Sequence, residues 1–537
     1  MDFVAEDFSE EERAKLAPFF TNLDEPVFAV VNLPEVVKGA LFARYSRSAK
    51  SLRRLFLDEF AEGSAEPTGA ASSGVGVGRA EQLYERVFFE YGDDSVAQLG
   101  GVHLACEQAS QLLAKVLEWG RLAAYLEQST RYVPYDDRPG GRWRYHVPSE
   151  LDAHGELRRN YERTLDRAFE TYARWLGPMQ DFYRELFPKD PADSDFVYRM
   201  TIRAKACDTL RGLLPAATRS NVGIFATAQS YEQMLLRMRA NPLVEVREYA
   251  SLMLTELRKV IPAFLTRVDL PDRGGRWTDY LRQTRDGTAE VAAKLLDGLV
   301  PEDRPVVTLT DFDPEGEVKV VAAALYAASA LPDDQLLDAA RRMTVDERSA
   351  VLEAYVGERT NRRHKPGRAF ERTSYRFDVL CDYGAFRDLQ RHRLLTIEWQ
   401  PLTTAHGFTV APEVRPAGAM DDWVEVMESC QGLYEAMRGA GLDDAAQYAI
   451  PMASRIRFVM HMNAREAMHL IELRTTPQGH PVYRQVAQMM HGLIDREAGH
   501  HAIAAAMAFV DHSSVELERL EAERRGEARR KGSVAGS

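Results

Sequence analysis

An internal repeat limits what this chain can fold into more than any other feature of its sequence. Residues 206–250 and 447–487 follow one pattern: an apolar turn that ends in proline, Pro215 or Pro451, and then a polar and aromatic stretch. A helical segment follows in each copy, with a glutamate near its middle and an arginine near its end. Self-similarity at this scale indicates that one structural unit has been duplicated within the chain.

The two arginines fall at the same place in the two copies, Arg239 in the first and Arg474 in the second, and a proline follows three residues after each. We therefore expect two related halves, which suits a chain of 537 residues that is too long for one typical domain. The expected parts are a first repeat at residues 1–300, a second repeat at residues 301–511 and a charged C-terminal tail at residues 512–537.

Helical patterns dominate the chain, and strand patterns are short. Apolar residues at spacings of three and four predict helices at residues 111–128, 157–176 and 423–439. Runs typical of strands lie at residues 27–31, 374–381 and 406–412, and residues 301–317 have the composition of a linker. The mixture predicts an α+β fold, in which each of two helix-rich repeats contains a small, mostly antiparallel sheet.

The composition is typical of a soluble protein, with 45% apolar and 28% charged residues. No run of eighteen apolar residues is present, and the acidic N-terminus lacks the apolar core of a secretory signal. Four cysteines lie far apart without a CxxC pair, which indicates reduced thiols and argues against a structural zinc site. We therefore expect a cytoplasmic protein with no membrane contact.

The net charge of −13 disfavours a nucleic-acid polymer as partner, but it leaves open a small phosphorylated ligand held by a local arginine cluster. Residues 390–402, QRHRLLTIEWQPL, offer such a cluster, because Arg391, His392 and Arg393 stand side by side. Three such side chains cannot all face water on a helix or strand, so at least one is expected to point inward.

Two further motifs accompany this cluster: residues 127–132 read EQSTRY, and residues 463–474 read NAREAMHLIELR. Together the three motifs resemble the flavin-dependent thymidylate synthase family. Its signature is R-H-R-x-x-S-x-N-E-x-S-x-R-Y, and a later helix carries N-A-R and E-L-R. This chain divides the signature, with the front at residues 391–393 in the second half and the back at residues 127–132 in the first.

Each half has lost the part of the signature that the other half keeps. Residues 119–121, WGR, replace R-H-R in the first half, and residues 398–402, EWQPL, replace the back in the second. In the family the active site lies between subunits, which contribute one face each. If the halves pair as those subunits do, one composite site keeps both faces. The opposite site has lost both, and we expect Trp119 and Trp399 to fill it.

The resemblance implies an enzyme that reductively methylates dUMP, or a close pyrimidine nucleotide, to dTMP. The implied cofactor is FAD, and the other implied small molecules are methylenetetrahydrofolate and NADPH. Because the family works as a tetramer of single units, a fused pair is expected to form a homodimer with pseudo-tetrameric symmetry. No metal is expected in the site.

The chemistry of the ligands explains why arginine recurs in these motifs. Arginine forks match phosphate oxygens bidentately and stay charged at any working pH. An arginine beside a pyrimidine can also stabilise the anion that forms when N3 loses its proton, and by resemblance this catalytic residue is Arg474. The implied substrate-binding residues are Glu127, Gln128, Ser129, Arg131, Arg211, Arg391 and Arg474. The implied flavin-binding residues are Arg391, His392, Arg393, Asn463, Arg465 and His469.

Two departures from the family and two alternatives remain. Asp388 stands where the family has glutamine, and Leu126 stands where it has asparagine, so the substrate could be a modified pyrimidine nucleotide. One alternative is a di-iron site, because residues 466–469 and 497–500 are two E-x-x-H pairs on helical stretches. The other is a catalytically degenerate pseudoenzyme that keeps the fold for nucleotide or flavin binding, or as an interaction scaffold.

Overall fold

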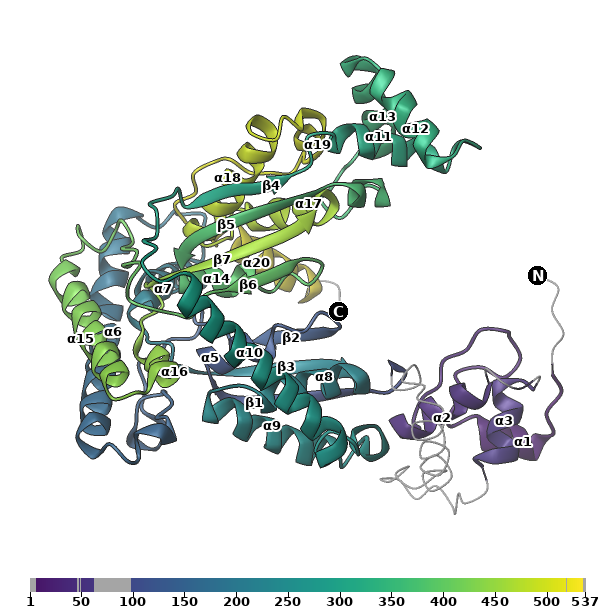
Figure 1. Ribbon diagram of the computed structural model, residues 1–537, viewed down its shortest axis with the longest axis horizontal. Helices are drawn as coiled ribbons and strands as arrows, with labels where there is room; N and C mark the ends of the chain where they lie inside the picture. The colour runs from purple at the N-terminus through teal and green to yellow at the C-terminus, as the bar shows by residue number, and fades with distance from the viewer. Residues whose placement is uncertain (1–5, 46–47, 49, 62–97, 518, 535–537) are drawn as a thin grey trace. The chain divides into compact units, whose positions relative to one another are not determined.

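The computed structural model describes residues 6–45, 48, 50–61, 98–517 and 519–534 (Figure 1). The chain divides into two compact units. Unit 1 comprises residues 1–107, 120–127 and 221–299, and unit 2 comprises residues 108–119, 128–220 and 300–537. Among the described residues, no helix is long and apolar enough to cross a membrane.

Unit 1 is built around a three-stranded sheet with the strand order β1-β3-β2. The strands are β1 (Gly101–Ser110), β2 (Ala123–Glu127) and β3 (Arg219–Thr227). β2 pairs antiparallel with β3, so that Glu127 lies opposite Val222. Burial alternates along β3, which is the period of a strand with one covered face. The helices of unit 1 are α1 (Glu10–Leu16), α2 (Glu35–Tyr45), α3 (Leu52–Glu59), α8 (Ala228–Arg239), α9 (Val244–Leu257) and α10 (Arg276–Leu295).

Unit 2 holds a four-stranded antiparallel sheet with the order β4-β5-β7-β6. The strands are β4 (Val307–Phe312), β5 (Ser374–Asp382), β6 (Thr396–Trp399) and β7 (Arg455–Asn463). Every second residue of β7 is buried, and most of β5 alternates in the same way, as expected when one face of a sheet covers a core. α17 (Ala464–Arg474) and α18 (Pro481–Arg496) contact this sheet (Figure 1).

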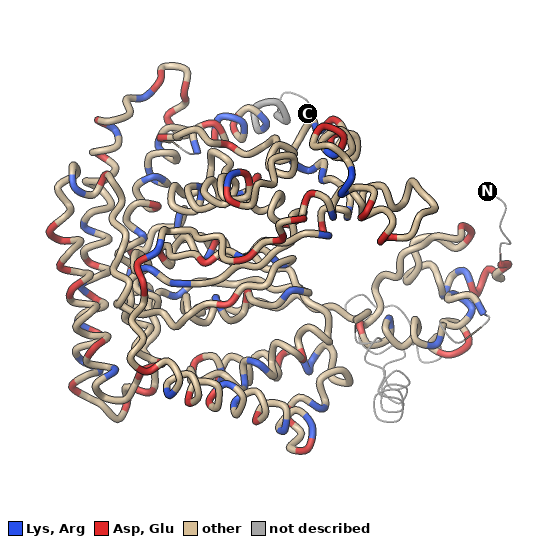
Figure 2. The backbone as a smooth tube through the Cα atoms, turned by 45° about the horizontal axis from the view of Figure 1, so that its top comes forward, with Lys and Arg blue, Asp and Glu red and all other residues tan. Residues whose placement is uncertain are grey.

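Unit 2 contains further helices besides α17 and α18. They are α5 (Gln111–Leu117), α6 (Gly155–Leu186), α7 (Asp195–Leu210), α11 (Gly316–Tyr326), α12 (Asp333–Arg342), α13 (Val345–Val356), α14 (Tyr383–Leu389), α15 (Met420–Gly439), α16 (Asp443–Ala446), α19 (His501–Ala506) and α20 (Leu520–Val534). The long helices α6 and α15 pack side by side, and the indole N–H of Trp175 donates to Asp422 across their contact at 2.7 Å. Basic and acidic residues are interspersed along these helices (Figure 2), so the charged cluster described below is a local feature.

The two sheets share one topology, because β1, β3 and β2 occupy the same order as β5, β7 and β6. The matching strands β1 and β5 each run directly into a short helix with a polar N-cap, Ser110 before α5 and Asp382 before α14. The predicted α+β fold with small antiparallel sheets is therefore confirmed. The predicted boundaries of the repeats, at residues 300 and 511, stay a prediction.

The two proline turns of the repeat meet inside unit 2. Pro215 and Pro451 form an antiparallel bridge, with a matched exchange of backbone hydrogen bonds on either side. Ala216 N donates to Ile450 O at 2.8 Å, and Met452 N donates to Leu214 O at 2.9 Å. Each bond is the counterpart of the other when the two prolines are aligned. The first repeat is thereby connected to the second next to Arg211 and α14.

Four local predictions were wrong in part. The helix expected at residues 111–128 ends at Leu117, because residues 123–127 instead pair with β3 as a strand. The strands expected at residues 27–31 and 406–412 are reduced to single bridges at Val30 and Phe408. The linker expected at residues 301–317 contains β4, because Val307 and Leu309 are buried where the strand extends the edge of the sheet at β5.

Candidate active site

Five segments of unit 2 bring charged side chains together. Asp208 lies near the end of α7, and Arg211 lies in the turn after it. Residues three apart on a helix share a face, so this aspartate and arginine reach the same region. Arg131 comes from the loop after β2, Asp388 from the end of α14 and Arg474 from the end of α17.

Asp208 is the centre of the first group of contacts. It accepts two hydrogen bonds from the guanidinium of Arg131, at 2.9 and 2.8 Å, and it lies 3.3 Å from Arg211. His480 lies 3.8 Å from the same carboxylate. Burial alone would raise the pKa of Asp208, but the charges of Arg131, His480 and Arg211 outweigh it and hold that pKa below its ordinary value. Asp208 therefore stays ionised in a buried site.

Asp388 is the centre of the second group. Its carboxylate pairs with Arg391, which lies one turn further on, and with Arg474 at 3.8 Å and Arg211 at 4.0 Å. Burial would raise the pKa of Asp388, and here too the neighbouring arginines, with Arg391 first, bring it below its ordinary value. Each aspartate thus serves more than one guanidinium. The four arginines and two aspartates joined by these ion pairs carry a net charge of +2.

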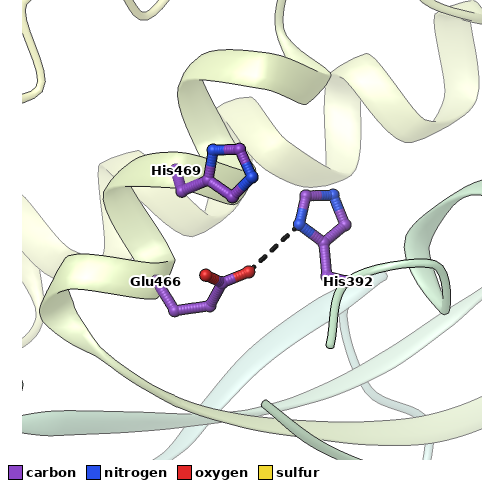
Figure 3. Close-up of side chains that lie close together, drawn as sticks. All are labelled: His392, Glu466 and His469. Carbon is purple, nitrogen blue, oxygen red and sulfur yellow. Dashed lines mark hydrogen bonds and ion pairs between the residues drawn. The ribbon is translucent and has the colours of Figure 1, made fainter. Parts of the chain in front are cut away.

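His392 connects this cluster to the start of α17. Its Nδ1 lies 3.1 Å from Glu466 Oε1, and the Nε–H of Arg474 donates to its Nε2 at 2.9 Å. Burial, with Arg474 and other cations nearby, lowers the pKa of His392 well below its ordinary value, so its ring is neutral. Figure 3 shows His392 facing Glu466, with His469 beside them on the same helix as Glu466.

A family model described as "Thymidylate synthase complementing protein" matches the chain twice, at residues 40–263 and at residues 308–498. The chain belongs to this family. Its two matches fall one in each half, which agrees with a tandem duplication. The sequence-based resemblance to flavin-dependent thymidylate synthases is confirmed at the level of the family.

Two curated relatives match this chain over nearly its whole length, and a third matches part of it. A UPF0159 protein of Chlamydia muridarum is 39% identical over 527 residues, which cover 97% of this chain and 99% of the relative. A UPF0159 protein of Thermoplasma acidophilum is 31% identical over 510 residues, covering 90% of this chain and 97% of the relative. A flavin-dependent thymidylate synthase of Clostridium tetani is 24% identical over 177 residues, which cover 33% of this chain and 66% of that protein.

The structure brings together four of the arginines that the family resemblance implied, and it places other implied residues around them. Gln128 and Ser129 precede Arg131, where the Ser129 hydroxyl accepts from the Arg131 backbone N–H at 3.3 Å. The Gln128 carbonyl accepts from Ser220 at 3.1 Å. Glu127 is buried at the end of β2 in unit 1. The Ser129 side chain therefore shapes the loop that carries Arg131.

The implied flavin-binding residues at the start of α17 form a second region, next to the arginine cluster. Asn463 is the N-cap of this helix, and its side-chain oxygen accepts from the backbone N–H of Glu466 at 2.9 Å. Arg465 donates to Pro366 O at 3.0 Å and pairs with Glu371 at 3.4 Å. Arg393 is half-buried in the turn after α14.

The surroundings of His469 are cationic. Burial, together with the charges of Lys365, Arg362, Arg474 and Arg465, lowers the pKa of His469 to about 4. A concentration of positive charge of this kind suits the phosphates of a dinucleotide.

A small cavity of about 50 Å³ adjoins the arginine cluster, and its lining includes Arg211, Asp382, Gly384 and His480. Nη2 of Arg211 and Oδ2 of Asp382 are buried there without a hydrogen-bond partner. Burial raises the pKa of Asp382 to about 6, although Arg211 opposes the shift. A β-carbon on Gly384 would lie 3.1 Å from Asp382 Oδ1 and 3.4 Å from Arg211 Cζ, so the glycine keeps this space open.

The di-iron alternative does not fit the structure. His500 contacts Tyr375 Oη at 2.7 Å and Asp313 O at 3.0 Å, away from the other E-x-x-H pair. Among the residues that the structure describes, one group has ligand atoms at metal-like spacing, within 4.8 Å of one another: His392, Glu466 and His469. It contains neither residue of the second pair, so the two pairs do not form one centre.

The sequence analysis missed three residues of the site: Asp208, His480 and Glu466. Asp208 stands three residues before Arg211, a helical spacing that could have suggested a shared face. Glu466 follows directly after the N-A-R motif and was considered only as a metal ligand. Nothing in the local sequence marks His480, which reaches Asp208 only through the fold.

Trp119 and Trp399, which were expected to fill the opposite site, contact each other edge to face with ring centres 5.5 Å apart. Lys115 Nζ lies 5.2 Å from the Trp399 ring centre, and burial lowers the pKa of this lysine to about 7. Two large rings and an alkyl chain thus occupy the region.

Proposed function

We propose that this chain is a flavin-dependent thymidylate synthase-like enzyme with one composite active site. The reaction is the reductive methylation of dUMP, or of a close pyrimidine nucleotide, to dTMP. Methylenetetrahydrofolate supplies the carbon, and NADPH supplies the reducing equivalents through FAD. Family membership supports this class of reaction, and the composite site rests on the arrangement of the arginines.

The observation that carries the proposal is the meeting of Arg131 and Arg211 with Arg391 and Arg474 around Asp208 and Asp388. The first two arginines come from one half of the chain and the last two from the other. A buried excess of positive charge is costly unless an anion compensates it. A nucleoside monophosphate carries about −1.5 to −2 on its phosphate at neutral pH, which matches the net +2 of the cluster.

The roles follow from the chemistry of each group. Arg131 and Arg211 bind the phosphate, and Gln128 and Ser129 lie on the same side of the site. Arg474 lies beside the pyrimidine and stabilises the anion that forms when N3 loses its proton, which makes the ring electron-rich at C5. No cysteine nucleophile is required for this route, and the four cysteines are buried.

The residues around α17 fit an anionic cofactor such as FAD. Lys365, Arg362 and Arg465 surround His469 with positive charge, as the dinucleotide phosphates require. Arg391, His392, Arg393, Asn463, Arg465 and His469 would hold the cofactor. When bound, the flavin supplies the hydride that completes the methyl group.

The alternative is a degenerate pseudoenzyme that keeps the fold to bind nucleotide or flavin, or as a scaffold. One observation favours it: Asp208 already occupies the fork of Arg131 with two short hydrogen bonds. A ligand phosphate has to compete with that carboxylate. Complementation of a thymidine auxotroph by this chain separates the two proposals, because the pseudoenzyme does not restore growth.

We also propose that the protein is a cytoplasmic homodimer. α10 is a 20-residue helix in which Thr278 is the buried residue, and apolar side chains such as Tyr280, Val291 and Leu295 are exposed along it. Exposed apolar residues gathered on one element are typical of an association surface.

The direct test of the function is purification followed by spectroscopy and assay. A bound flavin gives a yellow protein that releases FAD on denaturation, and dTMP formation from dUMP requires methylenetetrahydrofolate and NADPH. Binding of flavin and dUMP without turnover supports the pseudoenzyme. A colourless protein that neither takes up FAD nor binds dUMP refutes the enzyme and leaves the pseudoenzyme only as a scaffold.

A further inference from the structure

The geometry points to a positioning role for Glu466: it fixes the tautomer of His392, and His392 in turn orients the guanidinium of Arg474. This inference rests on the proposed function for the identity of the substrate. The hydrogen-bonded chain Glu466–His392–Arg474 can nevertheless be tested without any substrate.

The direction of each hydrogen bond follows from the groups involved. A guanidinium has N–H donors and no acceptor, so the contact of Arg474 Nε with His392 Nε2 at 2.9 Å requires a lone pair on Nε2. The His392 ring is neutral, and its single N–H is therefore on Nδ1. That N–H donates to Glu466 Oε1 at 3.1 Å. Removal of the carboxylate removes the acceptor that holds this tautomer.

Glu466 and Arg474 lie about two turns apart on α17, and the imidazole of His392 contacts both side chains. Glu466 is in the first turn of this helix, where the N-cap Asn463 binds its backbone N–H, and Arg474 is the last helical residue. Eight residues of helix rise about 12 Å. Helical side chains lean toward the N-terminus, so the long arginine side chain extends back toward His392.

This hydrogen-bonded chain determines where the N–H donors of Arg474 point. Its Nε is bound by His392, its Nη1 lies 3.8 Å from Asp388, and its guanidinium lies 5.4 Å from the ring centre of Tyr483. A planar group held at two corners and over a ring has one orientation left, which directs its remaining N–H groups. In the proposed reaction, that orientation determines whether Arg474 meets the pyrimidine.

Other charged groups lie near the hydrogen-bonded chain Glu466–His392–Arg474 and influence the protonation of Glu466 and His392. Burial raises the pKa of Glu466 to about 7, while Lys365 and Arg465 oppose the shift. An ionised carboxylate is a stronger acceptor than a carboxylic acid, so the hold on His392 weakens as the pH falls below about 7. The groups that face Glu466 or His392 are Lys365, Arg391, Arg465, His469 and Arg474. Arg362 faces His469, and Asp388 and Tyr483 face Arg474.

The same side chains have the spacing of a metal site, and this is the competing interpretation. Two observations disfavour it. An N–H of Arg474 already occupies Nε2 of His392, and four cations surround His469, where a divalent cation would be repelled.

The experiment compares Glu466→Ala with Glu466→Gln in the full-length protein. The glutamine keeps a neutral acceptor oxygen for the Nδ1–H of His392, and the alanine does not. Long-range 1H–15N NMR spectra of protein with 15N-labelled histidine report the tautomer, with His392→Gln to assign the signal. We expect the Nδ1–H tautomer in the wild-type protein and in Glu466→Gln, and its loss in Glu466→Ala.

A matched control is Glu472→Ala, which removes another buried carboxylate of α17, one that pairs with Arg359 at 2.7 Å. It should lower stability without altering the His392 signal. An unchanged tautomer in Glu466→Ala, or loss of the tautomer in the control as well, overturns the inference.

Binding of dUMP provides the second readout. Glu466→Ala should weaken dUMP binding about tenfold, and Glu466→Gln should stay within about threefold at pH 8. Below pH 7 the wild-type affinity should fall more steeply than that of Glu466→Gln, because protonation of the dUMP phosphate weakens binding in both. If the tautomer shifts as expected while dUMP does not bind at all, the hydrogen-bonded chain stands and the proposed substrate is wrong. Stoichiometric metal in the purified protein that is lost in Glu466→Gln overturns the positioning role.

Discussion

Arg131 and Asp208 are 77 residues apart in the chain and form a buried bidentate ion pair, with both N–O distances below 3.0 Å. Each side chain is more than nine-tenths buried. The pair holds the loop after β2 against the end of α7 and forms one wall of the candidate active site. The same contact stabilises the fold and occupies a fork that a phosphate would use.

Asp208→Ala should destabilise the protein more than Arg131→Ala. The aspartate variant leaves Arg131, Arg211 and His480 without their shared acceptor, and breaking a buried pair costs about 3–5 kcal/mol. After Arg131→Ala, Asp208 keeps Arg211 at 3.3 Å and His480 at 3.8 Å. Chemical denaturation measures both free energies of unfolding.

Inorganic phosphate should restore part of the stability of Asp208→Ala, because the anion replaces the carboxylate. The control is Asp378→Ala, since the pair of Asp378 with Arg457 is only half-buried. It should cost about 1 kcal/mol or less and should not respond to phosphate. Equal losses in the two aspartate variants would contradict the role given to Asp208.

The composite site and the opposite site should respond differently to loss of arginine. Arg131→Ala and Arg391→Ala face the same proposed ligands from different repeats, and each should weaken nucleotide or flavin binding roughly ten- to a hundredfold. Arg121→Ala and Arg239→Ala belong to the opposite site and should stay within about threefold. Isothermal titration calorimetry on the folded variants measures these affinities.

The number of FAD molecules bound per chain tests the same difference between the composite site and the opposite site. One composite site predicts one FAD per chain, measured from the absorbance of released flavin against the protein concentration. Two FAD per chain, or equal damage from Arg239→Ala and Arg474→Ala, would show that the composite site is wrong.

Stability should fall in mild acid because of the two aspartates of the cluster. The folded-state pKa values of Asp208 and Asp388 lie below their ordinary values, since the arginine charges outweigh burial. A carboxyl with a depressed pKa contributes stability above its unfolded pKa of about 3.9, and that contribution is lost as the pH falls toward the folded pKa. Unfolding free energies between pH 6 and pH 3 should therefore fall more steeply for the wild-type protein than for Asp208→Asn with Asp388→Asn. Parallel curves would mean that the aspartates do not drive the acid loss.

Gly384→Ala should close the small cavity and weaken nucleotide binding. The new β-carbon would meet Asp382 Oδ1 at 3.1 Å and Arg211 Cζ at 3.4 Å, so the Asp382 carboxylate has to shift beside the guanidinium. We expect a loss of about tenfold in dUMP affinity with a folded protein. Gly432→Ala on α15 is the matched control, because its β-carbon would meet no atom within 4 Å. That variant should gain up to about 1 kcal/mol of stability and bind dUMP unchanged.

The proposed homodimer should depend on the exposed face of α10. Light scattering at micromolar concentration should give twice the mass of the chain, which is 60.6 kDa. Val291→Glu with Leu295→Glu should shift the protein toward the monomer, because charges on an apolar contact are costly to bury. A wild-type monomer under these conditions would refute the dimer.

The sequence by itself determined the repeat, the fold class and the cluster of motif arginines. Pro215 and Pro451 lie at equivalent places in matching patterns, and the alternating residues of β5 are visible as a strand in the local sequence. The motifs at residues 391–393 and 463–474 identified the family, because short patterns at defined spacing survive in sequence.

Only the tertiary structure decided which acidic groups meet those arginines. Asp208 and Asp388 each pair with an arginine three residues further on, but their other partners, and the histidine that Glu466 contacts, come from helices and loops tens to hundreds of residues away. The same holds for residues 123–127, whose apolar spacing favours a helix but which form a strand because β3 provides its hydrogen-bond partners. Long-range pairing of backbone and charge depends on how the elements pack, and local pattern contains no record of it.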